Sequence, residues 1–164
     1  MSHLLPPTLA PLGFVLFFVG LWCLSMWGTS FLTGWHRLGR RFGKRTEPSR
    51  ESPSIGGLLL SIYMRYWTHY SGIVKITAAD NALYLSINIL FRCGHPPLEI
   101  PWSEIRIATR RVMLRNYVEL LLGRNAPIPL RLTERQARKL GLLDETGNLV
   151  LPEAGKQISS APIE

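Results

Sequence analysis

Cysteine and histidine are scarce in this sequence of 164 residues, which contains two cysteines and four histidines. A disulfide-stapled fold needs several cysteine pairs, so that class of small secreted protein is excluded. A structural zinc site needs three or four ligands at suitable spacing. Only His69, Cys93 and His95, with Glu104 nearby, lie in one part of the chain. These four residues could form a small thiol or metal site, which is the alternative to a protein without such a site.

The motifs of common catalytic sites are also missing. The chain has no G-x-S-x-G, H-E-x-x-H, C-x-x-C or G-x-G-x-x-G sequence. The segment GRRFGKR from Gly39 has three residues between its glycines and no Ser or Thr after the lysine, so it is not a phosphate-binding loop. These absences favour a non-catalytic protein, and we expect neither a cofactor nor a metal.

Charge is missing from the beginning of the chain. No charged residue precedes Arg37, and residues 12–32 form the apolar run LGFVLFFVGLWCLSMWGTSFL. At about 1.5 Å per residue, this run spans the roughly 30 Å hydrocarbon core of a bilayer. Residues 1–11 lack the basic segment of a secretory signal, and a buried soluble helix would usually show a polar stripe. The sequence therefore predicts a permanent transmembrane helix over 12–32.

Basic residues follow this run directly and predict its orientation. Because cationic flanks stay in the cytoplasm, we expect a single-pass protein of the inner (cytoplasmic) membrane, with residues 1–11 outside and everything after Gly34 inside. Residues 33–45 also have helical periodicity, with one apolar face among cations, which indicates an amphipathic segment along the membrane interface. A merely solvated flank is the alternative. The predicted membrane-interface residues are Trp35, Arg37, Leu38, Arg40, Arg41, Phe42, Lys44 and Arg45.

The net charge of +8 is concentrated in the same region. Residues 34–50 carry six Lys or Arg and one Glu, a net +5, so only +3 is left for the rest of the chain. A nucleic-acid-binding protein would place its basic excess on the folded domain, among stacking aromatics. Membrane lipids are therefore an expected partner, and nucleic acid is not.

A second compositional change marks a folded domain. Residues 46–54, TEPSRESPS, indicate a linker, and residues 55–143 consist of short apolar runs with a period of two. Turn signals separate these runs, among them His69 to Gly72 and Asp80-Asn81. About seven antiparallel strands without long crossover helices must close into a barrel or sandwich to bury their apolar face.

One helix is expected after these strands. Thr133 is a suitable N-cap, Glu134 follows in the first turn, and Gly141 is a suitable stop. Residues 144–164 are polar and proline-broken, which indicates a flexible C-terminal tail.

The stretch FRCGHPPLEIPWSEI, residues 91–105, predicts a stiff corner. Its prolines fix the backbone, and Leu98, Ile100 and Trp102 then share one side of a strand. Pro101 inside that strand indicates a sheet edge or a bulge, because proline donates no hydrogen bond to a ladder. We expect His95 and Glu99 to be exposed there and available to a partner.

The following strands carry four arginines. The four arginines of IRIATRRVMLR, together with Arg65 and Arg131 from other strands, are expected to form a basic surface toward acidic groups of a partner or the lipid headgroups. An ordinary solvated strand face is the alternative. The predicted partner-binding residues are His95, Glu99, Arg106, Arg110, Arg111 and Arg115.

LYLS at 83–86, GHPPLEIPWSEI at 94–105 and the succession of strands before one helix carry a resemblance. Over roughly 55–143 the chain resembles uncharacterised bacterial single-pass membrane proteins with a pleckstrin-homology-like (PH-like) domain. The resemblance implies a docking or oligomerisation module with no catalytic residue. The loop region THYSG has no Lys or Arg, so no lipid-headgroup pocket is expected.

These features together predict a membrane-anchored, non-catalytic interaction module. We expect an accessory or scaffold subunit of a larger inner-membrane complex of respiratory, photosynthetic or transport type. Other inner-membrane subunits are the expected protein partners, and a homo-oligomer remains open. The alternative is a small membrane-tethered enzyme using Cys93, His95 and His69.

Overall fold

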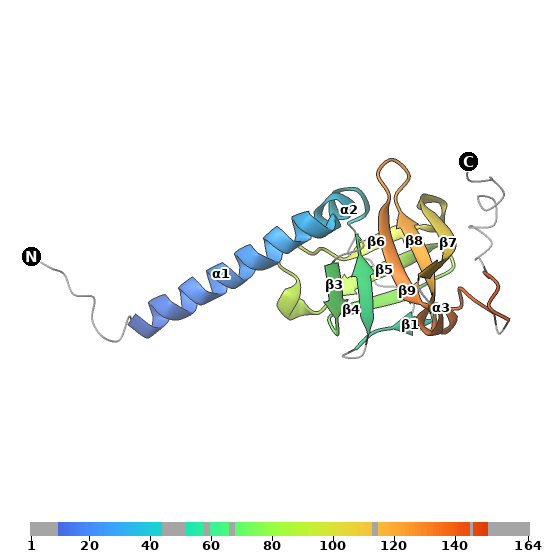
Figure 1. The fold of residues 1–164 in the computed structure, drawn as a ribbon. Helices are drawn as coiled ribbons and strands as arrows, with labels where there is room; N and C mark the ends of the chain where they lie inside the picture. Colours follow the sequence, from blue (N-terminus) through green and yellow to red (C-terminus); the bar gives the residue numbers. More distant parts are fainter. Residues whose placement is uncertain are drawn as a thin grey trace, which may run out of the picture.

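The computed structural model describes residues 10–43, 52–57, 60–65, 68–112, 115–144 and 146–150 (Figure 1). These residues form a long helix α1 (Ala10–Thr33), a short helix α2 (Trp35–Phe42), nine strands and a helix α3 (Glu134–Lys139). Figure 1 shows α1 projecting from a β domain to which α2 and α3 are attached. The predicted N-terminal apolar helix, mainly-β domain and C-terminal helix are thus present.

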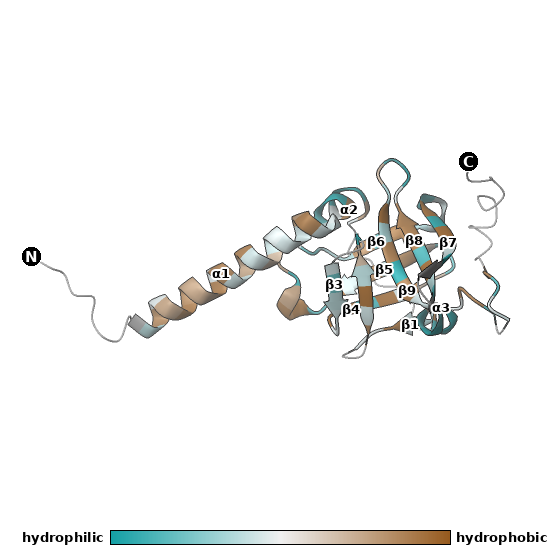
Figure 2. Cartoon of the chain, viewed as in Figure 1, coloured by the Kyte–Doolittle hydropathy of each residue, from teal (hydrophilic) through white to brown (hydrophobic). Residues whose placement is uncertain are grey.

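Helix α1 contains the whole predicted apolar run. Among the described residues it is the one helix long and apolar enough to cross a membrane, from Pro11 to Thr33. Its large side chains are exposed along its first half, as for Phe14 and Phe17, and Figure 2 shows its apolar colour along this length. An exposed apolar surface of this size needs cover other than water.

The nine strands form two antiparallel sheets. The first has the order β1 (Ser54–Ile55), β4 (Val74–Ala78), β5 (Ala82–Ile87) and β6 (Leu98–Pro101). The second has the order β3 (Thr68–Ser71), β2 (Ser61–Met64), β9 (Ile128–Thr133), β8 (Arg115–Leu122) and β7 (Ile105–Val112). Two 3-10 turns, η1 (Ile89–Phe91) and η2 (Trp102–Glu104), flank β6.

The expected number of about seven strands is therefore corrected to nine in the described residues. Strand β1 has two residues, too few for an alternating pattern. Strand β3 was expected as a turn because its sequence THYS is polar, but it pairs along its whole length with β2. Pairing to a neighbouring strand supplies hydrogen bonds that a local sequence pattern does not reveal.

The core lies between the sheets and follows the predicted alternation. Strand β6 buries Leu98 and Ile100, and Trp102 follows them into the core, as expected. Because β6 is the last strand of its sheet, the predicted edge position of Pro101 is confirmed. The larger buried side chains include Ile62, Met64, Ile76, Leu83, Leu85, Leu120, Leu122 and Leu130.

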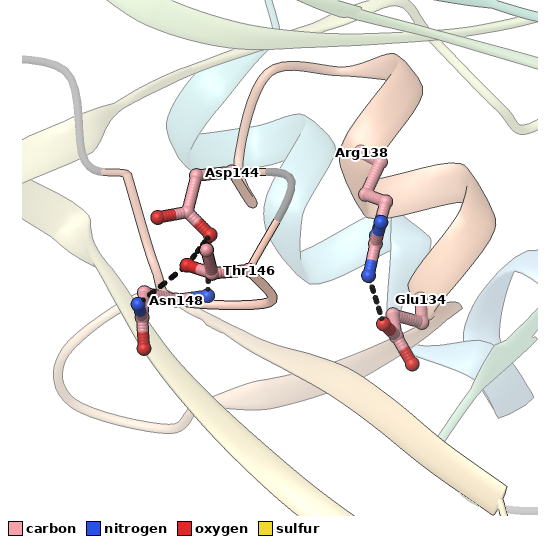
Figure 3. Close-up of polar contacts among 5 residues, drawn as sticks. All are labelled: Glu134, Arg138, Asp144, Thr146 and Asn148. Carbon is pink, nitrogen blue, oxygen red and sulfur yellow. Dashed lines mark hydrogen bonds and ion pairs between the residues drawn. The ribbon is translucent and has the colours of Figure 1, made fainter.

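Helix α3 begins as predicted. The Thr133 hydroxyl accepts a hydrogen bond from the Gln136 amide, and the Gln136 side chain accepts one from the Thr133 amide, which completes a capping box. Gln136 Nε2 also donates to the Ser61 carbonyl at 3.0 Å and so ties the helix to β2. Figure 3 shows the ion pair of Glu134 and Arg138, one turn apart at 2.6 Å.

The predicted tail begins with an ordered turn. Leu143 and Leu149 form an antiparallel bridge. The Asp144 carboxylate accepts hydrogen bonds from the Thr146 hydroxyl at 2.7 Å and from the Asn148 amide at 2.8 Å (Figure 3). These bonds, the one from Thr146 first, lower the pKa of Asp144 below its ordinary value. The domain therefore extends beyond 143, at least as far as this turn.

Candidate functional site

The C-terminal end of α1 leads directly into α2, which packs against the β domain. Gly34, at φ +82°, turns the chain from α1 into α2, and a Cβ there would lie 2.6 Å from Ile128 Cδ1. The positive φ is the condition that favours glycine here. Helix α2 then buries Trp35 and Leu38 in the core of the β domain. Their predicted lipid-facing position is therefore corrected: the apolar face of α2 packs on protein.

The other predicted membrane-interface residues divide into three groups. Phe42 is half-buried and packs against the core, while Arg37, Arg40 and Arg41 are exposed. Arg41 also pairs with Glu104 at 3.1 Å. Lys44 and Arg45 lie outside the described residues. Contact of these arginines with lipid headgroups stays a prediction.

Buried polar side chains connect α1 to the domain. We call this cluster the junction, and its members are Ser30, Thr33, Trp35, Tyr70 and His95. The Ser30 hydroxyl donates to the Gly94 carbonyl, and Trp35 Nε1 donates to the Pro96 carbonyl at 2.9 Å. The Tyr70 hydroxyl lies 3.0 Å from Thr33 Oγ1 and 3.1 Å from His95 Nε2. A short polar network thus joins α1, α2, β3 and the 93–96 loop.

His95 is at the centre of the junction and is only 2% exposed. Its predicted exposure is therefore wrong, because the Cys93–Pro96 turn folds back onto α1. The ring lies edge-on to Trp35, with centroids 5.4 Å apart. Burial lowers the pKa of His95, although the Cys93 carbonyl, 3.0 Å from Nδ1, partly opposes this. The imidazole is thus favoured in its neutral form.

The proton positions in the junction follow from this neutral ring. A carbonyl only accepts, so Nδ1 of His95 carries the proton and donates to Cys93. Nε2 must then accept, and the partner that donates to it is the Tyr70 hydroxyl. This hydroxyl has one proton and also donates toward Thr33 Oγ1, so the proton is shared between the Thr33 oxygen and Nε2 of His95. Burial also raises the pKa of Tyr70, which keeps its phenol protonated.

A small pocket opens beside the junction, with a volume of about 170 Å³. Its lining residues are Met26, Thr29, Thr68, His69, Tyr70, Ile73, Ile87, Phe91 and His95. Sites for small-molecule ligands usually measure about 300–1,000 Å³, so this pocket is small for such a ligand. The His69 ring contacts the Tyr63 ring in a tilted arrangement, with centroids 4.7 Å apart.

The structure brings His69 and His95 to the lining of this pocket, but Cys93 and Glu104 are not among its lining residues. The Cys93 sulfur lies 2.9 Å from the sulfur of Cys23 in α1, and both are free thiols. Glu104 accepts from Arg41 and from the Arg124 amide. Among the described residues, no group of three or more His, Cys, Asp and Glu side chains is placed to hold a metal ion.

The predicted partner-binding residues on the strands have different surroundings. Glu99 is half-buried on β6, and Arg106 is exposed on β7. Arg111 lies near the end of β7, opposite Asn116, and Arg115 begins β8 opposite Val112. The pair Arg115-Asn116, expected as a turn, is therefore part of a strand, and the arginines do not all share one face.

Arg110 has a partner that the sequence did not predict. Its Nε lies 2.9 Å from Oε2 of Glu119, which is fully buried on the neighbouring strand β8. Arg131 on β9 contacts the other oxygen, Oε1, at 3.2 Å. Oε2 is in ion-pair range without a well-aligned hydrogen bond, so the Arg131 contact is the better directed of the two. Part of the expected basic surface is thus neutralised internally.

Sequence reasoning missed Glu119 and most of the junction. A signal for Glu119 is present in YVELLL, where one acid interrupts an apolar strand beside arginine-containing strands. Ser30 and Thr33, three positions apart, are the corresponding signal on α1, since small polar side chains on one helix face often pack against protein. Nothing local indicated Tyr70, because its strand was expected as a turn.

No protein-family model matches the chain, and no curated protein matches it.

Proposed function

We propose that the protein is a single-pass, membrane-anchored interaction module, an accessory or scaffold subunit of a larger bacterial inner-membrane complex. In this proposal α1 crosses the bilayer with its N-terminus outside, and the β domain lies in the cytoplasm. The two antiparallel sheets with one C-terminal helix support a PH-like assignment of the domain. The proposed role is docking, in which the domain covers a surface of a neighbouring subunit.

The junction is the observation that carries this proposal. A protein that needed only attachment to a membrane could use a flexible linker after its helix. Here, α1 continues through Gly34 into the domain core, and Ser30 and Thr33 are buried against it. This arrangement fixes the distance and tilt of the domain relative to α1. A fixed placement is useful when the domain must meet a partner surface at a defined height above the bilayer.

The exposed face of β7 is the best candidate for the partner contact. Strand β7 is the last strand of its sheet, so no strand among the described residues pairs with its outer edge, and Arg106 on it is exposed. A partner with acidic groups would complement this edge. Other inner-membrane subunits and membrane lipids are the proposed partners. The same edge of β7 could also pair with a second copy of the chain in a homo-oligomer.

Purification from the native membrane tests the proposal. The full-length chain with an affinity tag is solubilised in a mild detergent, and co-purifying proteins are identified by mass spectrometry. We expect stable membrane-protein partners, weakened in the Arg106→Glu variant and at high salt, because exposed charges are screened over about 8–10 Å at physiological ionic strength. The Lys75→Glu variant, on β4 of the other sheet, is the matched control.

Other outcomes would contradict the proposal. A chain that purifies alone as a monomer would show that it is not a stable subunit. A bound metal in stoichiometric amount, lost in Cys93→Ser or His95→Ala variants, would instead support the small membrane-tethered enzyme.

A further inference from the structure

The most exposed large apolar side chains of the β domain lie together in one loop. Residues 88–93, the 88–93 loop, contain the turn η1 between β5 and β6. Ile89 is 79% exposed and Leu90 is 67% exposed, whereas the other exposed large apolar residues described in the domain, Tyr63 and Val150, are below half. Exposing two adjacent aliphatic side chains to water costs the free energy that burying their apolar surface would provide.

The loop lies along α1. Trp22 Nε1 donates to the Leu90 carbonyl at 3.4 Å, and the Trp22 and Phe91 rings are 5.5 Å apart. Trp22 precedes Thr33, the last residue of α1, by eleven residues, which corresponds to about 16 Å along the helix. In Figure 1 the yellow-green η1 turn extends from the sheets toward α1, and the same turn is brown in Figure 2. The tip of the loop is therefore level with the apolar middle of α1.

The backbone of the loop is prepared for an apolar environment. Within its six residues, four amide N–H groups donate hydrogen bonds and five carbonyl groups accept them. The donors are the amides of Asn88, Leu90, Phe91 and Arg92, and the acceptors are the carbonyls of Asn88, Ile89, Leu90, Arg92 and Cys93. Each unsatisfied backbone group is costly in an apolar layer, so these bonds lower the cost of bringing the loop into it.

The charges near the tip are also compatible with lipid. Arg92 is the one charged residue of the loop, and a long basic side chain can extend to the headgroup layer while its stem stays in the apolar region. The neighbouring His95 is buried and neutral, as derived above. No carboxylate occurs between Asp80 and Glu99.

We propose that Ile89 and Leu90 insert into the bilayer beside α1 and form a second lipid contact of the β domain. The occupant of this surface is the acyl-chain layer, because the loop continues the exposed apolar surface of α1 formed by Leu24 and Trp27. The inference rests on α1 spanning the bilayer, as in the proposed function, and it adds a residue-level lipid site in the domain itself. With the loop and α1 both in lipid, the domain cannot rotate about the helix axis.

Fluorescence quenching in liposomes tests the insertion. The full-length chain carrying Cys23→Ser and Cys93→Ser receives one new labelling site, by Leu90→Cys, Phe17→Cys or Asn81→Cys. Phe17 is exposed in α1, and Asn81 is exposed at the end of the β4–β5 hairpin opposite the 88–93 loop. Each variant is labelled with a polarity-sensitive fluorophore and reconstituted into pure phospholipid vesicles. Quenching by aqueous iodide and by lipids with a spin label on the acyl chain is then measured.

We expect the Leu90→Cys label to resemble the Phe17→Cys label. Both should be quenched by the spin-labelled lipid, and both should be severalfold less sensitive to iodide than the Asn81→Cys label. The Leu90→Cys label could be as sensitive to iodide as the Asn81→Cys label while the Phe17→Cys label is protected. In that case Ile89 and Leu90 do not insert into the bilayer, although α1 still spans it. An iodide-sensitive Phe17→Cys label would contradict the membrane anchor, and with it the proposed function.

A third outcome identifies a protein occupant. Protection of the Leu90→Cys label from iodide without quenching by the spin-labelled lipid would mean that a second copy of the chain covers the loop, since no other protein is present. That result would also overturn the lipid contact. Circular dichroism of each labelled variant verifies that the β domain remains folded.

Discussion

At the scale of single residues, the junction turns a buried histidine into a pH-sensitive contact. His95 donates through Nδ1 to Cys93 and accepts through Nε2 from Tyr70 only when its ring is neutral. Protonation would place a second donor against the Tyr70 hydroxyl, which would have to turn its proton toward Thr33. It would also place a charge on a side chain that is almost entirely buried. The junction should therefore weaken in acid.

The first prediction concerns this pH dependence. Because the folded pKa of His95 lies below its ordinary value of about 6.5, the unfolded chain binds more protons between the two values. The stability contributed by neutral His95 is complete above about pH 6.5 and is lost as the pH falls through the folded pKa. Each unit of lowering corresponds to about 1.4 kcal/mol. Thermal unfolding of wild type and His95→Gln in detergent, compared from about pH 8 to about pH 5, measures the difference.

The comparison with His95→Gln cancels the titration of the other histidines, which both proteins share. Wild type should lose stability relative to the variant as the solution becomes acidic. Parallel curves for the two proteins would show that the His95 ring is not held in its neutral form.

Glu119 gives the second prediction at the residue scale. Arg110→Glu places a carboxylate beside a fully buried one and should lower the free energy of unfolding by about 1–3 kcal/mol. Arg106→Glu, an exposed position on the same strand, should change it by less than about 0.5 kcal/mol. Chemical denaturation of the two variants gives both values. Equal effects would mean that Glu119 does not hold Arg110, and that Arg110 is as available to a partner as Arg106.

At the scale of elements, local signals predicted some features of the fold well. The uncharged run predicted α1, Thr133 predicted the start of α3, and Pro101 predicted a sheet edge, because each depends on a backbone or solvation property of the segment itself. The sequence predicted the apolar face of α2, but it did not predict that the core of the β domain buries this face. A helix face with Trp35 and Leu38 needs burial, and periodicity does not distinguish lipid from a protein core.

The third prediction tests which of the two covers α2. In detergent, Trp35→Ala should destabilise the β domain by about 3–5 kcal/mol, because it removes a fully buried aromatic side chain and its hydrogen bond to Pro96. Arg40→Ala, exposed on the same helix, should cost less than about 0.5 kcal/mol. Thermal unfolding followed by near-ultraviolet circular dichroism measures both. A mild effect of Trp35→Ala would indicate that the apolar face of α2 contacts the membrane interface and not the protein core.

At the scale of the whole molecule, contacts between distant segments determine how the domain sits against α1. Ser30 reaches the Gly94 carbonyl, Trp22 reaches the Leu90 carbonyl, and Arg65 donates to the Leu32 carbonyl at 2.9 Å. The last contact also places a cation at the negative C-terminal end of the helix dipole. None of these pairs is close in sequence, so no periodicity or motif could have predicted them. For the same reason, the burial of His95 could not be predicted from the turn that contains it.

The fourth prediction concerns the orientation of the whole chain in the membrane. Cations within about 15–20 residues of a membrane helix hold that side in the cytoplasm. Replacing Arg37, Arg40, Arg41, Lys44 and Arg45 together by Gln should therefore produce a mixture of two orientations, read from a C-terminal reporter active on one side only. The lost pair of Arg41 and Glu104 is partly exposed and should cost about 1 kcal/mol, so misfolding is not the expected cause.

As a matched control, an equal number of cations far from α1 in sequence is replaced by Gln: Lys75, Arg106, Arg124, Arg135 and Lys139. The control should keep the orientation of wild type, because its substitutions lie beyond the segment that is read during insertion. If the first set also kept it, the interactions of the folded domain rather than the basic flank would determine which side of the membrane it occupies.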